Sequence, residues 1–370
     1  MSQPGLEYIK FEDRHLIRDI YIPLTESEGG EGYQLAEAKM DEAYAFTGSP
    51  AAKLIFDGKD RQLTQWLLEL YAKSDAALEK RENFRLEHDG TLFRAHRALT
   101  VAGPEIALRA IPRETPTLEM LHMPDSTRTL LMDPDLLYGG FVLITASTGQ
   151  GKTTTASATV KSRLEKYKGY AATVEDPPEL PLHGWHGEGR CNQVPVTTVP
   201  GQMPGSGFAE ALVGARRYFP MISQGGTTLM IGEIRNAETA AETLLAANEG
   251  HLVIATFHGS SIQNALMRIA SMAADKMGVT QAYELLAGTL RLCVFQNLSI
   301  KAAGDWWERG EVKTKILSVH KDDTVITNAL RKPEFNAVVT AINAQAQQLA
   351  RLGDKPSLGD LKSALRGVKG

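Results

Sequence analysis

The stretch STGQGKTT, residues 147–154, carries residue types that together can bind a phosphate group. Backbone N–H groups of a small-residue loop can curl around a phosphate, and Gly149 and Gly151 allow close approach because they lack a Cβ. The Lys152 ammonium can reach the β and γ phosphates of a nucleotide, and the Thr153 hydroxyl suits Mg²⁺. The candidate phosphate-binding residues are Ser147, Thr148, Gly149, Gln150, Gly151, Lys152, Thr153 and Thr154.

This loop needs a buried strand before it and a helix after it. Residues 141–145 are apolar or β-branched, which is typical of a buried strand, and residues 156–167 favour a helix. The pattern is G-x-x-x-x-G-K-[ST] with Ala146 in place of the first glycine. The alternative is a chance glycine-rich turn, which the flanking strand and helix disfavour.

Carboxylates follow two further predicted strands. Glu175, Asp176 and Glu179 come after residues 169–174, and Glu233 follows residues 227–231. Ligands of open α/β sheets bind at the carboxyl ends of strands, where carboxylates can hold Mg²⁺ through water or orient an attacking water. Glu233 fits a general base. The alternatives are a solvated acidic turn for Glu175 and a helix-capping role for Glu233.

Histidines lie at both ends of the predicted strand 251–256. The seven-residue gap between His251 and His258 matches a strand that crosses the sheet, so the two do not form a metal pair. His258 lies at the active edge, where it either contacts a γ-phosphate or a neighbouring subunit, or is structural. His183, His186 and Cys191 lack an evident fourth ligand for zinc.

Composition bounds the class of protein. The chain has 370 residues, of which 43% are hydrophobic and 23% charged, as in ordinary globular proteins. A net charge of −4 gives no reason to expect direct nucleic-acid binding. Two cysteines imply no disulfide framework. We expect no signal peptide and no transmembrane segment, because neither pattern occurs, while attachment to a membrane complex stays open.

The spacing of elements predicts two domains. Residues 1–114 suggest a small α+β domain with helices at 31–46 and 61–80, followed by a strand meander. Residues 115–124 are predicted to be a linker. Residues 125–370 alternate strands and helices, which predicts a doubly wound, mostly parallel sheet with a C-terminal extension of helices and a strand pair.

Four motifs, in order, resemble those of the PilT-type ATPases of the secretion superfamily. ASTGQGKTT resembles the Walker A motif, TVEDPPE the Asp box, LMIGEIRNAET the Walker B motif and GHLVIATFH the His box. The resemblance implies a RecA-like P-loop ATPase domain, a PAS-like N-terminal domain, and ATP and Mg²⁺ as ligands. Thr153, Glu175 and Glu233 would hold Mg²⁺, partly through water, and Glu233 would be catalytic. Asp176 and Glu179 of the Asp box and His251 of the His box would contact the nucleotide, and Glu175 and His258 would take part in catalysis.

Residues 92–112 resemble the segment that closes the family's PAS-like domain. Arg94 and Arg109 match arginines that would complete a neighbouring subunit's site, where a guanidinium can stabilise the charge of phosphoryl transfer. The residues by themselves favour ordinary surface arginines. The family usually has an arginine directly before this glycine, whereas Ala102 precedes Gly103 here. The roles of the family's arginines therefore do not carry over to this chain one by one.

The resemblance implies a homo-hexameric ATPase, cytoplasmic and peripheral to the inner membrane, acting with a membrane-associated complex. The glycine- and proline-rich TTVPGQMPGSG and the segment GARRYFPMISQGGTT are closer to the DotB/TraJ branch of type IVB secretion and conjugation ATPases. A type IV pilus retraction ATPase and a P-loop kinase are the alternatives. A GTPase is disfavoured because no Asn-Lys-x-Asp motif occurs. A non-hydrolysing scaffold is disfavoured by the presence of Lys152, Thr153 and Glu233.

Overall fold

The computed structural model divides the chain into two compact units, Met1–Glu114 and Thr115–Gly370, which are described separately. The structure describes the following residues: 9–26, 33–34, 42–46, 53–54, 60–78, 83–112, 114–196, 207–220, 225–300, 310–333 and 335–366.

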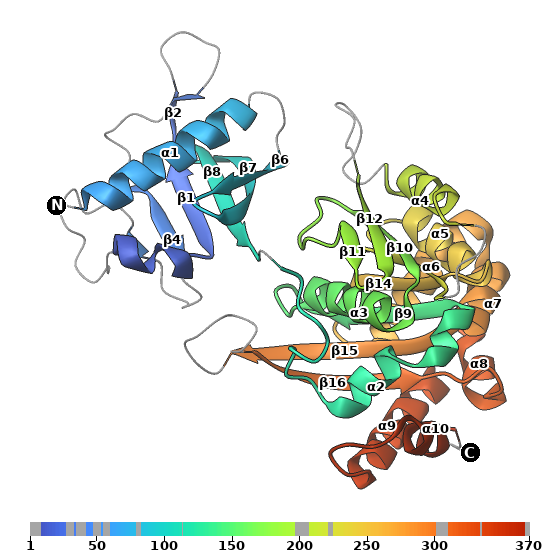
Figure 1. Cartoon of the computed structure of the whole chain (residues 1–370). Helices are drawn as coiled ribbons and strands as arrows, with labels where there is room; N and C mark the ends of the chain where they lie inside the picture. Colours follow the sequence, from blue (N-terminus) through green and yellow to red (C-terminus); the bar gives the residue numbers. More distant parts are fainter. Residues whose placement is uncertain are drawn as a thin grey trace. The chain divides into compact units, whose positions relative to one another are not determined.

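The first unit is an antiparallel sheet with a helix on one face (Figure 1). The strand order is β5–β4–β1–β8–β7–β6. The helix α1, Arg61–Leu78, buries Leu63, Leu67 and Leu70 in the same core as Phe93 and Ile106 of the sheet. The sheet strands are β1 (Asp19–Pro23), β4 (Tyr44–Phe46), β5 (Lys53–Leu54), β6 (Asn83–His88), β7 (Thr91–Thr100) and β8 (Gly103–Ile111). A 3₁₀ helix, Phe11–Leu16, and a hairpin of β2 (Thr25–Glu26) and β3 (Tyr33–Gln34) complete it.

The helix predicted at residues 31–46 is wrong. Tyr33–Gln34 and Tyr44–Phe46 are strands, while residues 35–41 lie outside the described part of the chain. The Tyr44 ring stacks on Tyr21 of β1 with 4.9 Å between ring centroids, and Ala45 is buried. Cross-strand packing of aromatic side chains thus overrides the local helical pattern. By contrast, the predicted helix at 61–80 and the strands near 83–111 are confirmed.

The second unit is a mostly parallel sheet with the strand order β11–β12–β10–β13–β14–β9–β15–β16. Strands from β12 to β15 in that order run parallel, and the edge strands β11 and β16 are antiparallel to their neighbours. The strands are β9 (Gly140–Ala146), β10 (Tyr170–Glu175), β11 (Gly184–His186), β12 (Gly189–Pro195), β13 (Thr227–Ile231), β14 (Leu252–His258), β15 (Leu290–Ile300) and β16 (Gly310–Ser318).

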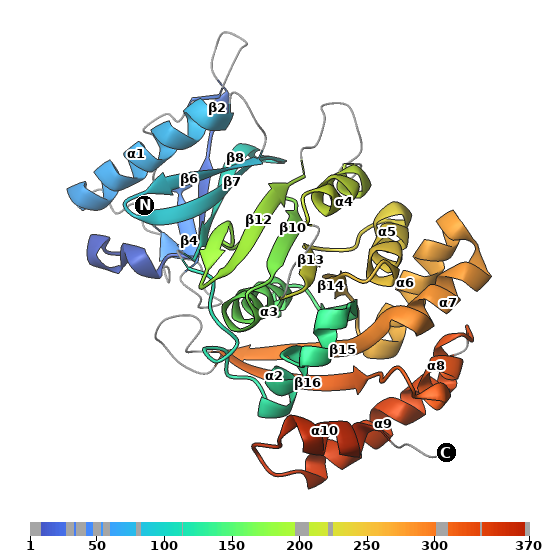
Figure 2. The same cartoon turned by 45° about the vertical axis from the view of Figure 1, so that its right-hand side comes forward.

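Helices cover both faces of this sheet, which confirms the doubly wound arrangement (Figure 2). Along β9, Phe141 and Leu143 pack into one hydrophobic cluster and Val142 and Ile144 into the other, because successive side chains of a strand point to opposite faces. One cluster takes residues of α4 (Phe208–Arg217), α5 (Ala237–Asn248), α6 (Ile262–Met277), α7 (Val279–Thr289), α8 (Thr324–Leu330) and α9 (Asn336–Arg351). The other takes residues of α2 (Asp125–Leu131), α3 (Lys152–Tyr167) and α10 (Leu358–Leu365).

Residues 115–124, which we predicted to be a linker, pack into the second unit. Leu118, Leu121 and Met123 are buried in the cluster that contains α3, and the Leu118 N–H donates to Ser162 Oγ at 2.9 Å. Two prolines, Pro116 and Pro124, make this short segment resemble a linker although it contains buried apolar side chains. This segment is therefore part of the core of that unit rather than a free connection.

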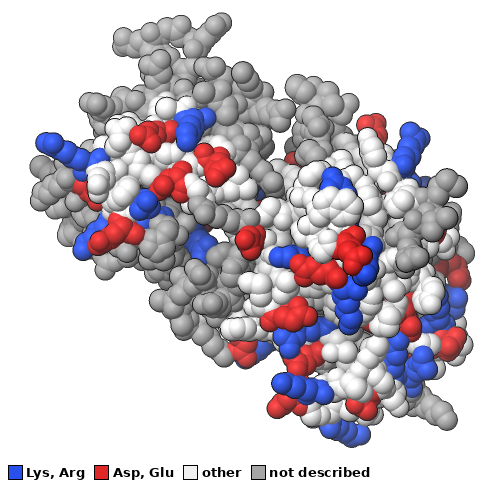
Figure 3. Space-filling model, in the orientation of Figure 1, with Lys and Arg blue, Asp and Glu red and all other residues white. Residues whose placement is uncertain are grey.

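Within the described residues, every helix is too short or too polar to cross a membrane. On the face shown in Figure 3, Lys and Arg side chains are interspersed with Asp and Glu.

Candidate active site

The predicted site residues of the second unit follow four neighbouring strands. Glu175 ends β10, Glu233 follows β13, His258 ends β14, and the phosphate loop follows β9. Ala146 lies opposite His258, and Val174 lies opposite Ile231, so these parallel strands end at one edge of the sheet. That edge is where open α/β sheets bind ligands.

The loop from Ser147 to Gly151 has the backbone shape that phosphate binding needs. Gly149 and Gly151 have φ angles of 74° and 76°, in the left-handed region that favours glycine. The sixteen-residue helix α3 begins at Lys152, so its free N–H groups and the positive end of its dipole face the loop. These features fit a nucleotide phosphate, with Lys152 as its cation and Thr153 as the hydroxyl for Mg²⁺.

Ala146 is accommodated in place of the usual glycine. It is the last residue of β9, is fully buried, and its carbonyl oxygen accepts a hydrogen bond from the Gly259 N–H at 3.3 Å. An extended strand position places no demand for positive φ, so a methyl group is tolerated there.

A side-chain amide on the sheet forms a hydrogen bond with the phosphate loop. Gln296, fully buried on β15, donates from Nε2 to the Gln150 carbonyl oxygen at 2.6 Å. The Gln150 side chain in turn accepts from the Leu298 N–H through Oε1 at 2.7 Å. Sequence reasoning missed Gln296, since the pairing of β15 with β9 leaves no local signal.

The ammonium group of Lys152 interacts electrostatically with two of the predicted carboxylates, those of Glu233 and Glu179. Its Nζ donates to the Ser147 carbonyl oxygen at 3.0 Å. Burial lowers the pKa of Lys152 below its usual 10.5, while the charges of Glu233 and Glu179 act in the opposite direction. The ammonium and both carboxylates therefore share one end of the sheet.

Glu175 is buried, so the solvated acidic turn is ruled out for this residue. Thr173 Oγ1 and Gln193 Nε2 donate to Glu175 Oε1 at 2.7 and 3.0 Å, and the Glu179 N–H donates to Oε2 at 3.4 Å. Burial raises the pKa of Glu175, and these hydrogen bonds oppose that shift. The sequence had already marked the segment of Thr173 and Glu175 as the Asp-box motif. The sequence analysis assigned no role to Gln193, a residue of β12 whose side chain holds the Glu175 carboxylate in place through this hydrogen bond.

Glu233 has a different setting and is not a helix cap. The cap of α5 is Asn236, whose side chain accepts from the Thr239 N–H at 2.9 Å. Glu233 instead forms an ion pair with Arg235, with 2.7 Å between Oε2 and Nε, and its side chain is 30% exposed. A partly exposed carboxylate beside the phosphate loop can accept a proton from water.

The two histidines lie at opposite edges. The exposed His258 has its Nδ1 3.5 Å from Thr148 Oγ1, beside the phosphate loop. His251 precedes β14, where its Nδ1 lies 2.7 Å from Thr227 Oγ1. A strand of this length places His251 about 20 Å from the phosphate loop of its own chain. The prediction that His251 binds that nucleotide is therefore wrong, because only one end of a crossing strand reaches the site.

Arg94 and Arg109 belong to the first unit. They lie directly opposite each other on β7 and β8. Arg109 Nε lies 2.7 Å from Asp19 Oδ1, and the arginine side chain is 66% exposed. Asp176, half-buried in the turn after Glu175, stays a predicted site residue, as do these arginines.

These features define a P-loop nucleotide-binding protein. They are a mostly parallel sheet with helices on both faces, a phosphate loop whose turns are made by glycines, and a neighbouring strand that is followed by a carboxylate. Residues 78–321 match the family described as "Type II/IV secretion system protein", and the chain belongs to that family. This match confirms the resemblance to the secretion-superfamily ATPases, and the relatives include two proteins named as pilus ATPases, PilU and PilB.

Solved structures and sequence relatives agree with this assignment. The ATPase DotB of Legionella pneumophila is 21% identical with a TM-score of 0.62, and the match covers 98% of this chain and 97% of DotB. The pilus retraction motor PilT with bound ADP is 23% identical with the same TM-score, covering 98% of both chains. At these identities the likeness shows the fold.

Among sequence relatives, the uncharacterized Escherichia coli protein YggR is 29% identical over 265 residues, 70% of this chain and 72% of YggR. The type IV pilus ATPase PilU of Pseudomonas aeruginosa is 32% identical over 194 residues, 52% of this chain and 46% of PilU. The match thus spans about half the length of PilU.

Proposed function

We propose that this protein is an ATP-hydrolysing motor that forms a homo-hexameric ring and powers a type IVB secretion or conjugal transfer system at the inner membrane. The observation that carries the proposal is the shared sheet edge of the phosphate loop, Glu233 and Glu175. In this proposal the protein is cytoplasmic and acts on a membrane-associated complex.

The residues divide the chemistry among them. The loop backbone and Lys152 bind the phosphates, and Thr153 holds Mg²⁺ with Glu175 and Glu233 acting partly through water. When bound, Mg²⁺ neutralises charge that develops on the phosphoryl oxygens. Glu233 orients the attacking water and accepts its proton. In this proposal His258, which lies beside Thr148, contacts the γ-phosphate.

A ring gives a reason for the paired arginines. The register of β7 and β8 sets Arg94 opposite Arg109, so the two guanidinium groups lie close together on one sheet, where Arg109 also pairs with Asp19. Two neighbouring guanidinium groups suit a negatively charged phosphate presented by a neighbouring subunit. In this proposal the first unit, which we infer to be PAS-like, completes the site of the next subunit.

A pilus retraction ATPase is the second candidate. DotB and PilT resemble this chain with the same TM-score, so the fold suits both systems. The glycine- and proline-rich stretch before α4 favours the secretion branch, although residues 197–206 of it lie outside the described residues.

The test is a measurement of mass by light scattering, with and without a slowly hydrolysed ATP analogue, alongside the ATPase rate. We expect a nucleotide-stabilised hexamer that turns over ATP. The matched control is Lys152→Ala, which should bind no nucleotide and should show no nucleotide-dependent assembly. A monomer with full turnover would contradict the ring motor and would favour a kinase-like enzyme.

A further inference from the structure

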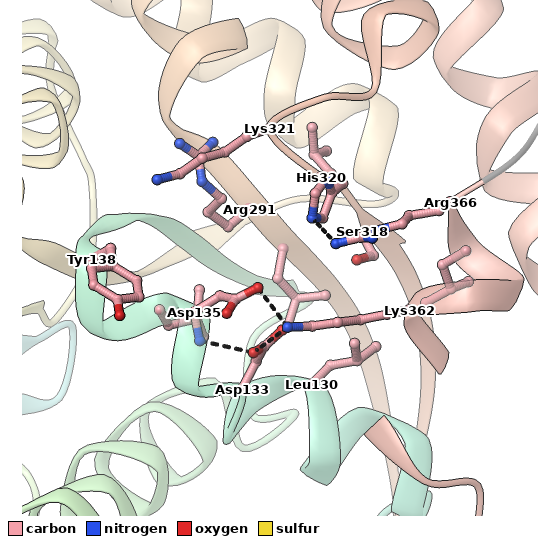
Figure 4. A pocket seen from close by; sticks show the side chains of 14 residues that line it. Leu130, Asp133, Asp135, Tyr138, Arg291, Ser318, His320, Lys321, Lys362 and Arg366 are labelled. Atoms are coloured by element: carbon pink, nitrogen blue, oxygen red, sulfur yellow. Dashed lines mark hydrogen bonds and ion pairs between the residues drawn. The ribbon is translucent and has the colours of Figure 1, made fainter. Parts of the chain in front are cut away.

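A pocket lies in the second unit, here called the ATPase unit, at the opposite end of the sheet from the phosphate loop. It is lined by the 3₁₀ helix Pro134–Tyr138, the start of β15, the end of β16 and α10 (Figure 4). Because β9 begins directly after that 3₁₀ helix and ends at the phosphate loop, about 20 Å of strand separates the two sites. The pocket therefore belongs to neither the nucleotide site nor its carboxylates.

The pocket's two carboxylates are already paired. Lys362 Nζ lies 2.9 Å from Asp133 Oδ1 and 2.5 Å from Asp135 Oδ2. The hydrogen bond from Lys362 lowers the pKa of Asp135, so this carboxylate stays ionised. Figure 4 shows this group at one side of the pocket, apart from the arginine and lysine discussed next.

Three cationic side chains remain: Arg291, Lys321 and Arg366. Figure 4 shows Arg291 and Lys321 extending side by side in the same direction. Among the described residues, neither forms an ion pair; Arg291 Nη1 donates to the Leu290 carbonyl oxygen at 2.9 Å, while the buried Nε has no hydrogen-bond partner. Arg366 contacts His320 Nε2 at the other side. Neighbouring cations repel each other, so a bound anion would lower the energy of this arrangement.

The size of the pocket limits its ligand. Its volume is about 160 Å³, which is below the roughly 300 Å³ at which sites for drug-sized ligands begin. A liquid water molecule occupies about 30 Å³, so the space suits a small anion or one end of a larger molecule. Arginine favours phosphate because its planar guanidinium donates two parallel hydrogen bonds.

We propose that this pocket binds a small phosphate-bearing anion, with Arg291 and Lys321 on one side and Arg366 on the other. The anion is either free or the phosphate end of a soluble nucleotide. Arg291 lies at the start of β15, and the same strand carries Gln296, which bonds to the phosphate loop. An anion at the pocket therefore lies at the far end of an element that touches the nucleotide site.

The test titrates inorganic diphosphate into the full chain by calorimetry, in a Lys152→Ala background that removes phosphate-loop binding. We expect one bound diphosphate per chain. Lys321→Gln together with Arg366→Gln should weaken it about tenfold or more, because hydrogen bonds to charged groups are lost. Both residues are exposed, so the fold should persist, and an unchanged thermal midpoint checks this. The matched control is Lys313→Gln with Lys315→Gln, two exposed lysines of β16 outside the pocket, which should leave binding unchanged.

A second titration with ADP, in the same background, distinguishes the sources. Tighter binding than diphosphate, lost in the same double variant, identifies a nucleotide phosphate as the ligand, and weaker binding identifies a free anion. Absence of diphosphate and ADP binding in the Lys152→Ala protein overturns the proposal. So does diphosphate binding that the Lys321→Gln, Arg366→Gln variant leaves unaltered.

Discussion

Glu175 and Glu233 lie at the same sheet edge in opposite surroundings. Glu175 is 2% exposed and accepts hydrogen bonds from Thr173 and Gln193, whereas the Glu233 side chain is 30% exposed and pairs with Arg235. A general base must exchange its proton with solvent, which Glu233 can do. Glu175 is held rigidly and suits a positioning role towards Mg²⁺ or its waters. The two glutamates carry the same chemical group, but their different environments suit them to different roles in the reaction.

Glu233→Gln should stop turnover while leaving ATP bound. The amide has the same shape but cannot accept a proton, and loss of a general base typically costs about 10²–10⁴-fold in rate. Steady-state ATPase assays and nucleotide-binding measurements check both effects. The matched control is Glu238→Gln, an exposed glutamate on α5 that pairs with Lys276. Normal turnover in Glu233→Gln would move the catalytic role to Glu175.

The raised pKa of Glu175 makes stability depend on pH. The folded state binds the proton more tightly than the unfolded state, so stability is fully present below the ordinary pKa of 4.5 and falls as pH rises through the folded pKa. Glu175→Gln, whose amide oxygen can accept the same bonds from Thr173 and Gln193, should flatten this fall. Denaturant unfolding followed across that pH range measures the slopes. Identical slopes in both proteins would show that Glu175 does not titrate differently on folding.

At the level of elements, the phosphate loop is held from β15 as well as from its own strand. Gln296→Met keeps the side-chain volume and removes the hydrogen bond to the Gln150 carbonyl oxygen. Loss of one neutral hydrogen bond corresponds to roughly 0.5–1.5 kcal/mol, so ATP affinity should fall about two- to tenfold. Fluorescent-nucleotide titration measures the change. Gln345→Met is the control, because Gln345 bonds to Ser318 and lies with α9, away from the loop. An unchanged affinity in Gln296→Met would show that β9 and α3 alone fix the loop.

The elements around this loop were predictable to different degrees. β9, β13 and β14 carry their signals locally as apolar runs, and α3 begins directly after the phosphate loop; each of these elements is confirmed. The place of β15 beside β9 depends on pairing between residues about 150 positions apart, which no local pattern encodes. The failed helix at 31–46 and the buried segment 115–124 have the same cause, since tertiary packing decided both. By contrast, the sequence order of the strand already placed His258 at the active edge, and in the structure His258 lies beside Thr148 of the phosphate loop.

At the scale of the whole molecule, the ATPase unit carries the phosphate loop and the acids, whereas Arg94 and Arg109 lie in the other unit. If the ring proposal holds, removing either arginine should lower turnover and leave nucleotide binding intact, because the guanidinium acts on charge that develops during the reaction. Arg14→Ala is the matched control: Arg14 lies in the same unit and pairs with Asp89 instead.

Mixed rings separate an arginine that acts across subunits from one that acts within its own chain. Arg94→Ala subunits keep Glu233 and Lys152, and Glu233→Gln subunits keep Arg94. In a ring that contains both, an Arg94→Ala subunit beside a Glu233→Gln subunit would have a complete site if the arginine comes from the neighbour. We therefore expect ATPase activity to rise on mixing two nearly inactive variants, to a maximum near equal proportions. Activity that simply averages the two would place Arg94 in its own subunit's site or outside catalysis, because no mixed site would then be complete.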